Sequence, residues 1–262
     1  MDFPLETIIL AVDAMVFAAC FLAYYKKKTI INQIENAPQL GITNDLKNVV
    51  MDYPGYRIPY ACIQGVVKPI GVPIISNSNP KVNGVVQYII LREHIAQLTE
   101  GHWSDRQRII RKIRNVVPFT ISNSEQSVKI LAPLSAAMLD MDIISDTYSG
   151  NAQEVISHAW SHILGVKQTG IQTTEKMLKS GTILTAIGEL SLSPDRKQVF
   201  VTPPSNGAPY FLTFMEVSSL LAKLKRSKFT YGIVCAVCFA LGLYLCVRFQ
   251  KKKKDTDFRL VE

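Results

Sequence analysis

Cysteines are few in this sequence, and their positions do not suit a cross-linked domain. Four of the five, Cys20, Cys235, Cys238 and Cys246, fall in two long apolar runs, which leaves Cys62 alone between the runs. No internal disulfide can therefore join two parts of the intervening segment. The chain also contains no N-x-[ST] acceptor site for glycosylation. Because secreted and cell-surface domains of this size commonly carry both features, their absence favours an organelle membrane that is reached without the secretory route.

Signature motifs of several enzyme classes are also missing. The sequence contains no G-x-S-x-G nucleophile elbow, no G-x-x-x-x-G-K phosphate loop and no G-x-G-x-x-G dinucleotide fingerprint. We therefore assign no catalytic residue, no metal ligand and no cofactor to this chain. A hydrolase displayed on a membrane stays a rival hypothesis, but it lacks a recognisable nucleophile and base.

One histidine cluster has two interpretations. Glu154, His158 and His162 recur at every fourth position of a helix predicted over Asn151–Leu164, an arrangement that places all three on one face, where they could bind zinc. A polar helix face beside Trp160 accounts for the same residues. The order is not HExxH, and no fourth ligand is near in the sequence.

Two further polar stretches also have two interpretations each. Asp140, Asp142 and Asp146 alternate with apolar residues, which is typical of an exposed strand edge as well as of an acid–base pair. Arg106–Asn115, RQRIIRKIRN, is expected to form a helix with its isoleucines on one face and its basic residues elsewhere. Such a helix could bind an anionic lipid surface or an acidic partner, or it could simply present a solvated face.

Positive charge is concentrated beside the two apolar runs. The formal net charge is +8, and thirteen of the 29 basic residues flank or follow these runs. The central portion, residues 29–222, then carries 16 basic and 15 acidic residues. A nucleic-acid-binding function is therefore disfavoured, because it would need a basic surface on the folded domain itself.

Both apolar runs are long enough to cross a bilayer as helices. Ile8–Tyr25 contains a single charge, and Phe229–Val247 contains none. At about 1.5 Å per residue the shorter run extends about 27 Å, close to the hydrocarbon thickness of about 30 Å. A cleaved signal peptide is the alternative for the first run, but its leader, MDFPLE, is acidic and no small-residue cleavage site follows. We expect an uncleaved anchor at each run.

The runs divide the chain into five predicted segments: a short tail (1–7), a first transmembrane helix (8–25), a loop domain (26–228), a second transmembrane helix (229–249) and a short basic tail (250–262). Two spans place both tails on one side of the membrane and the loop domain on the other. The basic residues expected at the membrane surfaces are Lys26, Lys27, Lys28, Lys228, Arg248 and Lys251. Because basic residues lie on both sides, they do not set the orientation.

Asp13 is the one charge inside the two apolar runs, Ile8–Tyr25 and Phe229–Val247. A carboxylate costs about 2.5–3.5 kcal/mol at the middle of a bilayer and less near an end of the helix. Protonation or nearby headgroups would make Asp13 tolerable, and a partner on the second span is the functional alternative. Two pairs of small residues could let the two helices pack together. These are Ala14 and Ala18 in the first span and Ala236 and Ala240 in the second.

The loop domain is expected to be an α+β domain, richer in strand than in helix. Short β-branched or aromatic runs predict strands at Tyr60–Val67, Gly84–Leu91 and Ser127–Leu131, and a hairpin from Ile183–Leu192 and Val199–Val201. The predicted helices are a short one capped by Thr43 or Asn44, and the segments Asn151–Leu164, Thr173–Lys179 and Met215–Lys228, the last of which leads into the second span.

Five separated blocks of the loop occur in a specific order between the two spans. They are PYACIQGVV from Pro59, GVVQYIILREH from Gly84, the pair His102–Trp103, VPF from Val117, and TGIQTTEKMLKSGTILTAIGEL from Thr169. Together with the two anchors, these blocks resemble the GIDE or "beside a membrane" domain of the mitochondrial RING-type ubiquitin ligase family, also known as mitochondrial-anchored protein ligase.

This resemblance implies an outer mitochondrial membrane protein with its loop domain in the intermembrane space and both ends in the cytosol. It also implies the ligation of ubiquitin or SUMO to regulators of mitochondrial fission and stress signalling. In that family a RING after the second span recruits a charged ubiquitin-conjugating enzyme and orients its thioester toward a target lysine.

The sequence departs from that family at the RING. A RING folds around zinc ions held by cysteine and histidine, and residues 250–262 contain neither. We therefore expect a RING-less chain, truncated or natural, that is inactive as a ligase alone and binds a conjugating enzyme only if a RING is restored. The expected function is a membrane-anchored module that binds or senses protein partners. A non-catalytic two-span scaffold or channel subunit is the alternative.

Overall fold

A computed structural model describes residues 5–99, 102–123, 126–150 and 166–259. The chain divides into two compact units. One consists of residues 1–37 and 215–262, and the other of residues 38–214. Each unit is described by itself.

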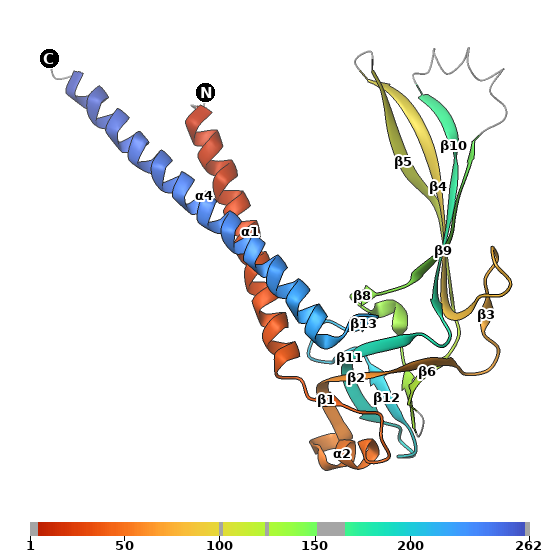
Figure 1. Ribbon diagram of the computed structural model, residues 1–262. Helices are drawn as coiled ribbons and strands as arrows, with labels where there is room; N and C mark the ends of the chain where they lie inside the picture. The colour runs from red at the N-terminus through yellow and green to blue at the C-terminus, as the bar shows by residue number, and fades with distance from the viewer. Residues whose placement is uncertain (1–4, 100–101, 124–125, 151–165, 260–262) are drawn as a thin grey trace. The chain divides into compact units, whose positions relative to one another are not determined.

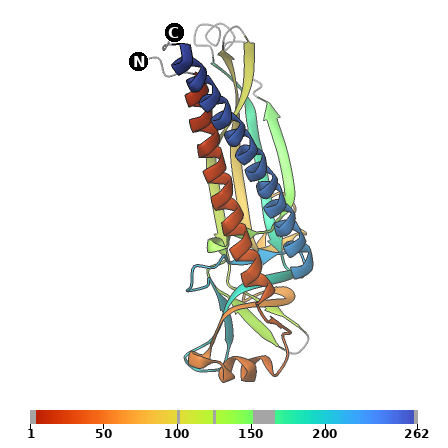
Figure 2. The same ribbon diagram turned by 90° about the vertical axis from the view of Figure 1, so that its left-hand side faces the viewer.

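The first unit is a pair of long antiparallel helices, α1 (Leu5–Glu35) and α4 (Val217–Arg259), which lie side by side in both views (Figures 1 and 2). The Lys225 Nζ atom lies 2.7 Å from Glu35 Oε1, so the last turn of α1 meets the first turns of α4. Both helices are long and apolar enough to cross a membrane, by length and composition. The α4 helix confirms the helix predicted at Met215–Lys228 and its continuation into the second apolar run.

The second unit is built mainly of strands, as the sequence predicts, and the whole chain is of the α+β class. Its elements are β1 (Gln39–Leu40), α2 (Leu46–Asp52), η1 (Pro54–Tyr56), β2 (Arg57–Pro69), β3 (Ile74–Ile75), β4 (Asn83–Thr99), β5 (His102–Val116), β6 (Phe119–Ser122), β7 (Ser127–Ile130), η2 (Pro133–Ser135), β8 (Met138–Leu139), β9 (Asp142–Gly150), β10 (Val166–Lys179), β11 (Ile183–Leu192), β12 (Val199–Thr202) and β13 (Phe211–Thr213).

Five of these strands form a closed barrel. In order round the barrel they are β2, β6, β7, β12 and β11, and β11 pairs back with β2. The interior contains fully buried apolar side chains such as Phe119, Ile121 and Leu184, and Val50 of α2 belongs to the same core. A methyl group on Gly65 of β2 would lie 2.7 Å from the Ile42 side chain and 3.0 Å from the backbone oxygen of Ser122 in β6, so this close approach favours glycine.

The barrel sheet is extended by β1 on β2 and by β13 and β8 beyond β11. A second, five-stranded antiparallel sheet contains the other strands, and we call it the blade (Figure 1). Its order is β5, β4, β10 and β9, with the short β3 also on β4. Val85, Val86 and Leu178, at the base of β4 and β10, belong to the barrel core. The blade is therefore fixed to the barrel at one end.

The strand predictions for β2, β4 and β7 and the β11–β12 hairpin are confirmed. Two helix predictions are wrong. Thr173–Lys179 lies in β10, which pairs on both sides, and Arg106–Asn115 lies in β5, which pairs with β4 over almost its whole length. Both segments contain good helix formers, but pairing with neighbouring strands outweighs this local preference. The helix predicted at Asn151–Leu164 lies outside the described residues.

A buried carboxylate joins the blade to a loop without any ion pair. Glu175 of β10 accepts hydrogen bonds at Oε1 from the Asn77 backbone N–H (3.0 Å) and from Gln87 Nε2 (2.7 Å), and at Oε2 from the Ser78 N–H (3.0 Å). Gln87 in turn accepts a bond from Asn115 Nδ2 of β5. Burial raises the pKa of Glu175, but its hydrogen bonds from Ser78, Gln87 and Asn77 lower the pKa more, so the net shift is downward.

Replacing this carboxylate is expected to destabilise the domain. Glu175→Gln leaves a buried donor without its acceptor, which costs about 1–3 kcal/mol of unfolding free energy. Because the folded-state pKa is lowered, the contribution of Glu175 is full above the unfolded value of about 4.3 and is lost as the pH falls through the folded-state pKa.

Urea unfolding of the detergent-solubilised protein, followed by its circular dichroism, measures both effects. Glu216→Gln, at an exposed carboxylate, is the matched control and should change the unfolding free energy by less than about 0.5 kcal/mol. Equal stability of wild type and Glu175→Gln at neutral pH would contradict this role.

Candidate functional site

Asp13 faces the other helix of the pair. The buried Cys238 of α4 lies near the Asp13 carboxylate. A methyl group on Gly242 would lie 3.2 Å from Asp13 Oδ2, so the missing side chain of Gly242 leaves room for the carboxylate. A partner on the second helix is therefore present. A functional use of this contact stays a prediction.

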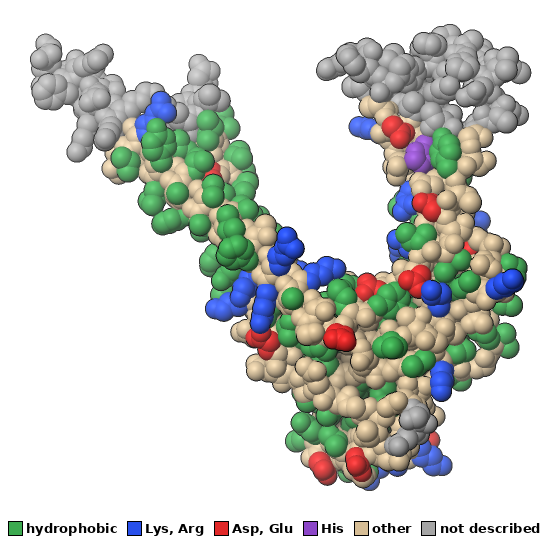
Figure 3. All heavy atoms as spheres, viewed as in Figure 1, with side chains coloured by type: hydrophobic (Ala, Val, Ile, Leu, Met, Phe, Trp, Pro, Cys, Tyr) green, Lys and Arg blue, Asp and Glu red, His purple; other side chains and the backbone are tan. Residues whose placement is uncertain are grey.

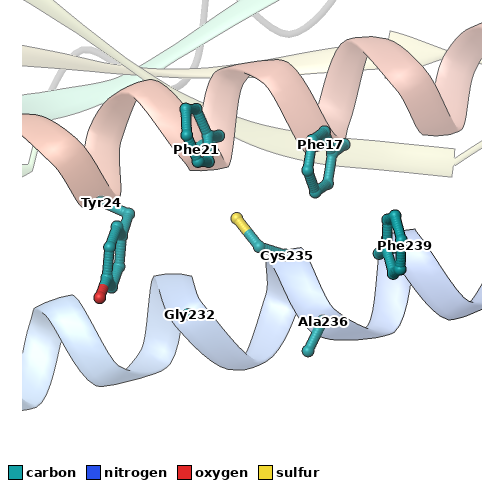
Figure 4. Close-up of a pocket in the computed structure, with 7 residues that line it drawn as sticks. All are labelled: Phe17, Phe21, Tyr24, Gly232, Cys235, Ala236 and Phe239. Atoms are coloured by element: carbon teal, nitrogen blue, oxygen red, sulfur yellow. The ribbon is translucent and has the colours of Figure 1, made fainter.

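An apolar groove lies beside this contact, between the same two helices (Figure 4). Its volume is about 370 Å³. Its lining residues are Phe17, Phe21 and Tyr24 of α1 and Gly232, Cys235, Ala236 and Phe239 of α4. The rings of Phe17 and Phe239 approach to 6.5 Å between centroids, and Tyr24 lies against Gly232. The lining is mainly apolar, which is the chemistry of a surface that contacts lipid chains.

The small-residue packing predicted for the spans is wrong. Ala14, Ala18, Ala236 and Ala240 are all exposed on the helix pair. The helices instead meet through the aromatic side chains of Phe17 and Phe239, and through Tyr24 and Asp13 against the two glycines of α4. The rotation of each helix about its axis decides which residues face the partner, and residue size alone does not reveal that rotation.

The predicted membrane-flanking residues lie on the two helices, at either end of their apolar stretches. Figure 3 shows Lys and Arg side chains gathered at one end of the apolar surface of the helix pair. Lys26 and Lys28 of α1 are exposed, Lys228 of α4 is half-buried, and Arg248 is exposed near the other end of the apolar stretch. Lys27 is half-buried, and Lys251 is part of α4. Their role at membrane surfaces stays a prediction.

The three aspartates of 140–146 do not form an acid–base pair. Asp140 Oδ2 accepts bonds from Thr213 Oγ1 (2.5 Å) and the Phe214 N–H (3.2 Å), whereas Asp142 forms an ion pair with Lys179 (2.8 Å). Asp146 accepts its hydrogen bonds from Gln172 and Thr174 of β10. Asp142 and Asp146 belong to β9, an edge strand among the described strands of the blade. This agrees with the interpretation of the alternating aspartates as an exposed strand edge.

A row of hydrogen bonds crosses the blade at Asp146. Its Oδ1 atom accepts bonds from Gln172 Nε2 and Thr174 Oγ1, both 2.8 Å, and Arg92 Nη1 donates to Thr174 (3.0 Å). These hydrogen bonds from Gln172 and Thr174, with the nearby positive charge of Arg92, lower the pKa of Asp146. Asp146 is therefore a charged carboxylate on an exposed strand throughout the neutral pH range.

His94 does not have the surroundings of a catalytic base. Its Nε2 atom lies 3.0 Å from Gln172 Oε1, and its Nδ1 atom lies 3.5 Å from Asp105 Oδ2. The ring of Tyr148 packs edge-on against the imidazole, with centroids 5.2 Å apart. Both ring nitrogens are thus next to acceptors within the sheet, which suits a structural role.

The structure describes Cys62 of the loop domain but not the three residues of the possible zinc site. Cys62 is buried in β2, and burial raises the pKa of its thiol to about 11, so this thiol is not a reactive nucleophile at neutral pH. Glu154, His158 and His162 lie outside the described residues. Among the residues that are described, no group of three or more His, Cys, Asp or Glu side chains is arranged to hold a metal ion.

The long basic strand β5 is the feature that sequence reasoning misjudged. Its basic residues are Arg106, Arg108, Arg111, Lys112 and Arg114. They were expected on a helix, but the structure places them on a strand whose only described neighbour is β4. One feature of the sequence could have predicted this strand. The centre of the segment is rich in β-branched residues, because Ile109, Ile110 and Ile113 occur among its basic residues.

Known proteins are similar to this chain over most of its length. A family model described as GIDE, E3 ubiquitin ligase, matches residues 91–247. Mitochondrial E3 ubiquitin protein ligase 1 of Drosophila melanogaster is 36% identical over 253 residues, which cover 96% of this chain and 74% of that protein. Mitochondrial ubiquitin ligase activator of NFKB 1 of Homo sapiens is 30% identical over 264 residues, with 97% and 74% covered. E3 ubiquitin-protein ligase SP1 of Arabidopsis thaliana is 18% identical over 168 residues, with 64% and 48% covered. No solved structure gives a significant match.

The contact between the helices can be tested by cross-linking. In Asp13→Cys the new thiol faces native Cys238, so mild oxidation or a short bifunctional maleimide should join α1 to α4. A protease site is also inserted at the exposed turn Pro194–Arg196, so that cleavage leaves α1 and α4 on different fragments. A non-reducing gel then shows whether the two fragments stay linked. Ala14→Cys, which is exposed on α1, is the control and should give a several-fold lower yield. Equal yields from the two variants would show that the helices do not pack in this register.

Proposed function

The chain belongs to the GIDE family of E3 ubiquitin ligases, and from this premise we propose that it anchors a protein-binding domain of a ubiquitin ligase in a mitochondrial membrane. The relatives support the compartment, because the fly and human proteins are named as mitochondrial ubiquitin ligases. The structure supports the anchoring, because a strand-rich domain is inserted between two helices long and apolar enough to cross a bilayer.

The observation that carries this proposal is the exposed apolar surface of the helix pair. Large side chains that point away from the partner helix include Met15, Leu22, Phe229 and Tyr244, each at least 63% exposed. An apolar surface of this length is unfavourable in water, whereas in lipid it meets hydrocarbon and the helical backbone satisfies its own hydrogen bonds.

We place the domain of residues 38–214 in the intermembrane space and both ends of the chain in the cytosol, with the helices in the outer membrane. Two spans put both ends on one side. The missing sequons and the single loop cysteine support a route outside the secretory pathway. A ubiquitin-conjugating enzyme, which works in the cytosol, would then be engaged on the side of the C-terminus, with ubiquitin or SUMO passed to proteins of mitochondrial fission.

Within this arrangement the loop domain serves binding. Glu175, Asp140 and His94 of this domain are engaged in hydrogen bonds that hold its strands and loops. Recognition by such a domain uses its surfaces and strand edges, and the chemistry of conjugation belongs to the conjugating enzyme and the RING that recruits it.

Proximity labelling tests both the compartments and the partners. A biotin-labelling enzyme fused after Glu262 should label cytosolic proteins, including ubiquitin-conjugating enzymes. The same enzyme inserted at the exposed Gly71–Val72 loop should label proteins of the intermembrane space, because exposed loop tips tolerate insertions. A second insertion at the turn Pro194–Arg196 is the matched control and should reproduce the Gly71–Val72 pattern. Labelling of one and the same compartment from the C-terminus and from the loop would contradict the proposal.

A further inference from the structure

The two long edges of the blade carry opposite charge. Strand β5 contains five basic residues and one acidic residue, whereas β9 contains two aspartates and no basic residue. In the part of the chain that the structure describes, β5 pairs only with β4, and β9 pairs only with β10. Each edge therefore presents backbone N–H and C=O groups in a form that another strand can pair with.

The directions of the strands suit a second copy of the same sheet. Because β5, β4, β10 and β9 alternate in direction, β5 and β9 run antiparallel to each other across the blade (Figure 1). A second blade placed beside the first in the same orientation would set its β9 antiparallel to β5. The antiparallel pattern would continue across the junction, with one register shift in β5 between Arg111 and Ile109. Strand β9 has nine residues, so the shared edge would be about 30 Å long.

The registers within one blade define which residues would meet. Lys112 lies opposite Ile90, Ile90 opposite Thr174, and Thr174 opposite Asp146, so these four residues form one row. Extending that row into a second copy brings Asp146 opposite Lys112. Cross-strand pairs of opposite charge stabilise antiparallel strands, and like charges destabilise them.

Neighbouring rows are compatible with the same junction. Ile109 of β5 shares a row with Tyr148 of β9, through Arg92 and Gln172. Both side chains are more than half exposed, at 57% for Ile109 and 55% for Tyr148. The next copy would bring this aliphatic and this aromatic side chain together, and such pairs are among the favourable cross-strand contacts. Arg111 shares a row with Thr147, which adds no repulsion.

We propose that β5 of one copy pairs with β9 of a second copy, so that the blades join edge to edge into a continuous sheet. The pairing joins unlike edges, because β5 against β5 would oppose basic residues and β9 against β9 would oppose aspartates. Contacts between unlike surfaces make rings or open arrays rather than closed dimers. The proposal goes beyond the proposed function and does not depend on it.

A pair of introduced cysteines tests this junction on the full chain in membranes. In one chain the Cα atoms of Lys112 and Asp146 are separated by three strand spacings, about 14 Å, too far for a disulfide. Across the proposed junction they are opposite each other at about 4.5–5.5 Å, which a disulfide can bridge. After mild oxidation, the double variant Lys112→Cys/Asp146→Cys should give a ladder of dimers, trimers and larger species on a non-reducing gel.

The controls separate this junction from other contacts. Each single variant retains the five native cysteines and should stay monomeric, whereas an equimolar mixture of the two single variants should give dimers without a ladder. Lys197→Cys/Asp52→Cys, at exposed positions away from the blade, should give no ladder. The absence of a ladder from the Lys112/Asp146 double variant would overturn the proposal, and so would dimers formed by Lys112→Cys alone.

A charge reversal gives a second measurement in case the cysteine variants fold poorly. Lys112→Glu and Asp146→Lys should each shift the detergent-solubilised protein to smaller species in light scattering, and mixing the two variants should restore the larger species because the charges again match. Lys197→Glu is the matched control. A different outcome would show that the proposal is wrong and that the basic edge binds lipid. In that outcome the wild type is monomeric, Lys112→Glu loses binding to vesicles that contain anionic lipid, and Asp146→Lys keeps this binding.

Discussion

Inside a bilayer no water is available to bond with the backbone, and this constraint decides the layout of the molecule. Only a segment that satisfies its own backbone groups can cross, and the two apolar runs meet this condition because they are helices. Because the Glu35–Lys225 ion pair joins the end of α1 to the third turn of α4, the chain leaves and re-enters the helix pair at the same end. The domain of residues 38–214 therefore needs termini that lie close together, a property common among domains that tolerate insertion.

The loop domain meets that requirement without disulfides or metal ligands among its described residues. Its barrel closes through the β2–β11 pairing, which leaves no edge within the barrel itself. Buried carboxylates, such as Glu189 with the Ser205 N–H and hydroxyl, fix the loops by hydrogen bonds to backbone and hydroxyl groups. The polar residues inside the domain are thus used for structure. Among the described residues, the edge strands β5 and β9 of the blade each pair with one strand only.

The sequence predicts the elements of this fold better than their contacts. Strands with β-branched or aromatic runs, such as β2 and the β11–β12 hairpin, could be predicted because local preference and final structure agree. Strand β10 could not, since its helix-forming residues are held extended by β4 on one side and β9 on the other.

The side-chain contacts of the candidate sites could not be predicted from the sequence, for a different reason. The residue opposite Asp13 depends on how both helices are rotated, so neither Cys238 nor Gly242 could be named from the sequence, and the alanine pairs were a wrong choice. The row from Lys112 to Asp146 depends on three strand registers between segments far apart in the chain. Each register is set by packing of the blade, and a shift of one residue in any of them would move the side chains to the opposite face.

The most direct measurement of the central claim is extraction of mitochondrial membranes with alkaline carbonate, which releases proteins held by surface contacts and leaves proteins that cross the bilayer. If α1 and α4 both lie in lipid, the chain stays in the membrane pellet together with a known integral protein. Recovery of the chain in the soluble fraction, beside a known peripheral protein, would contradict the account.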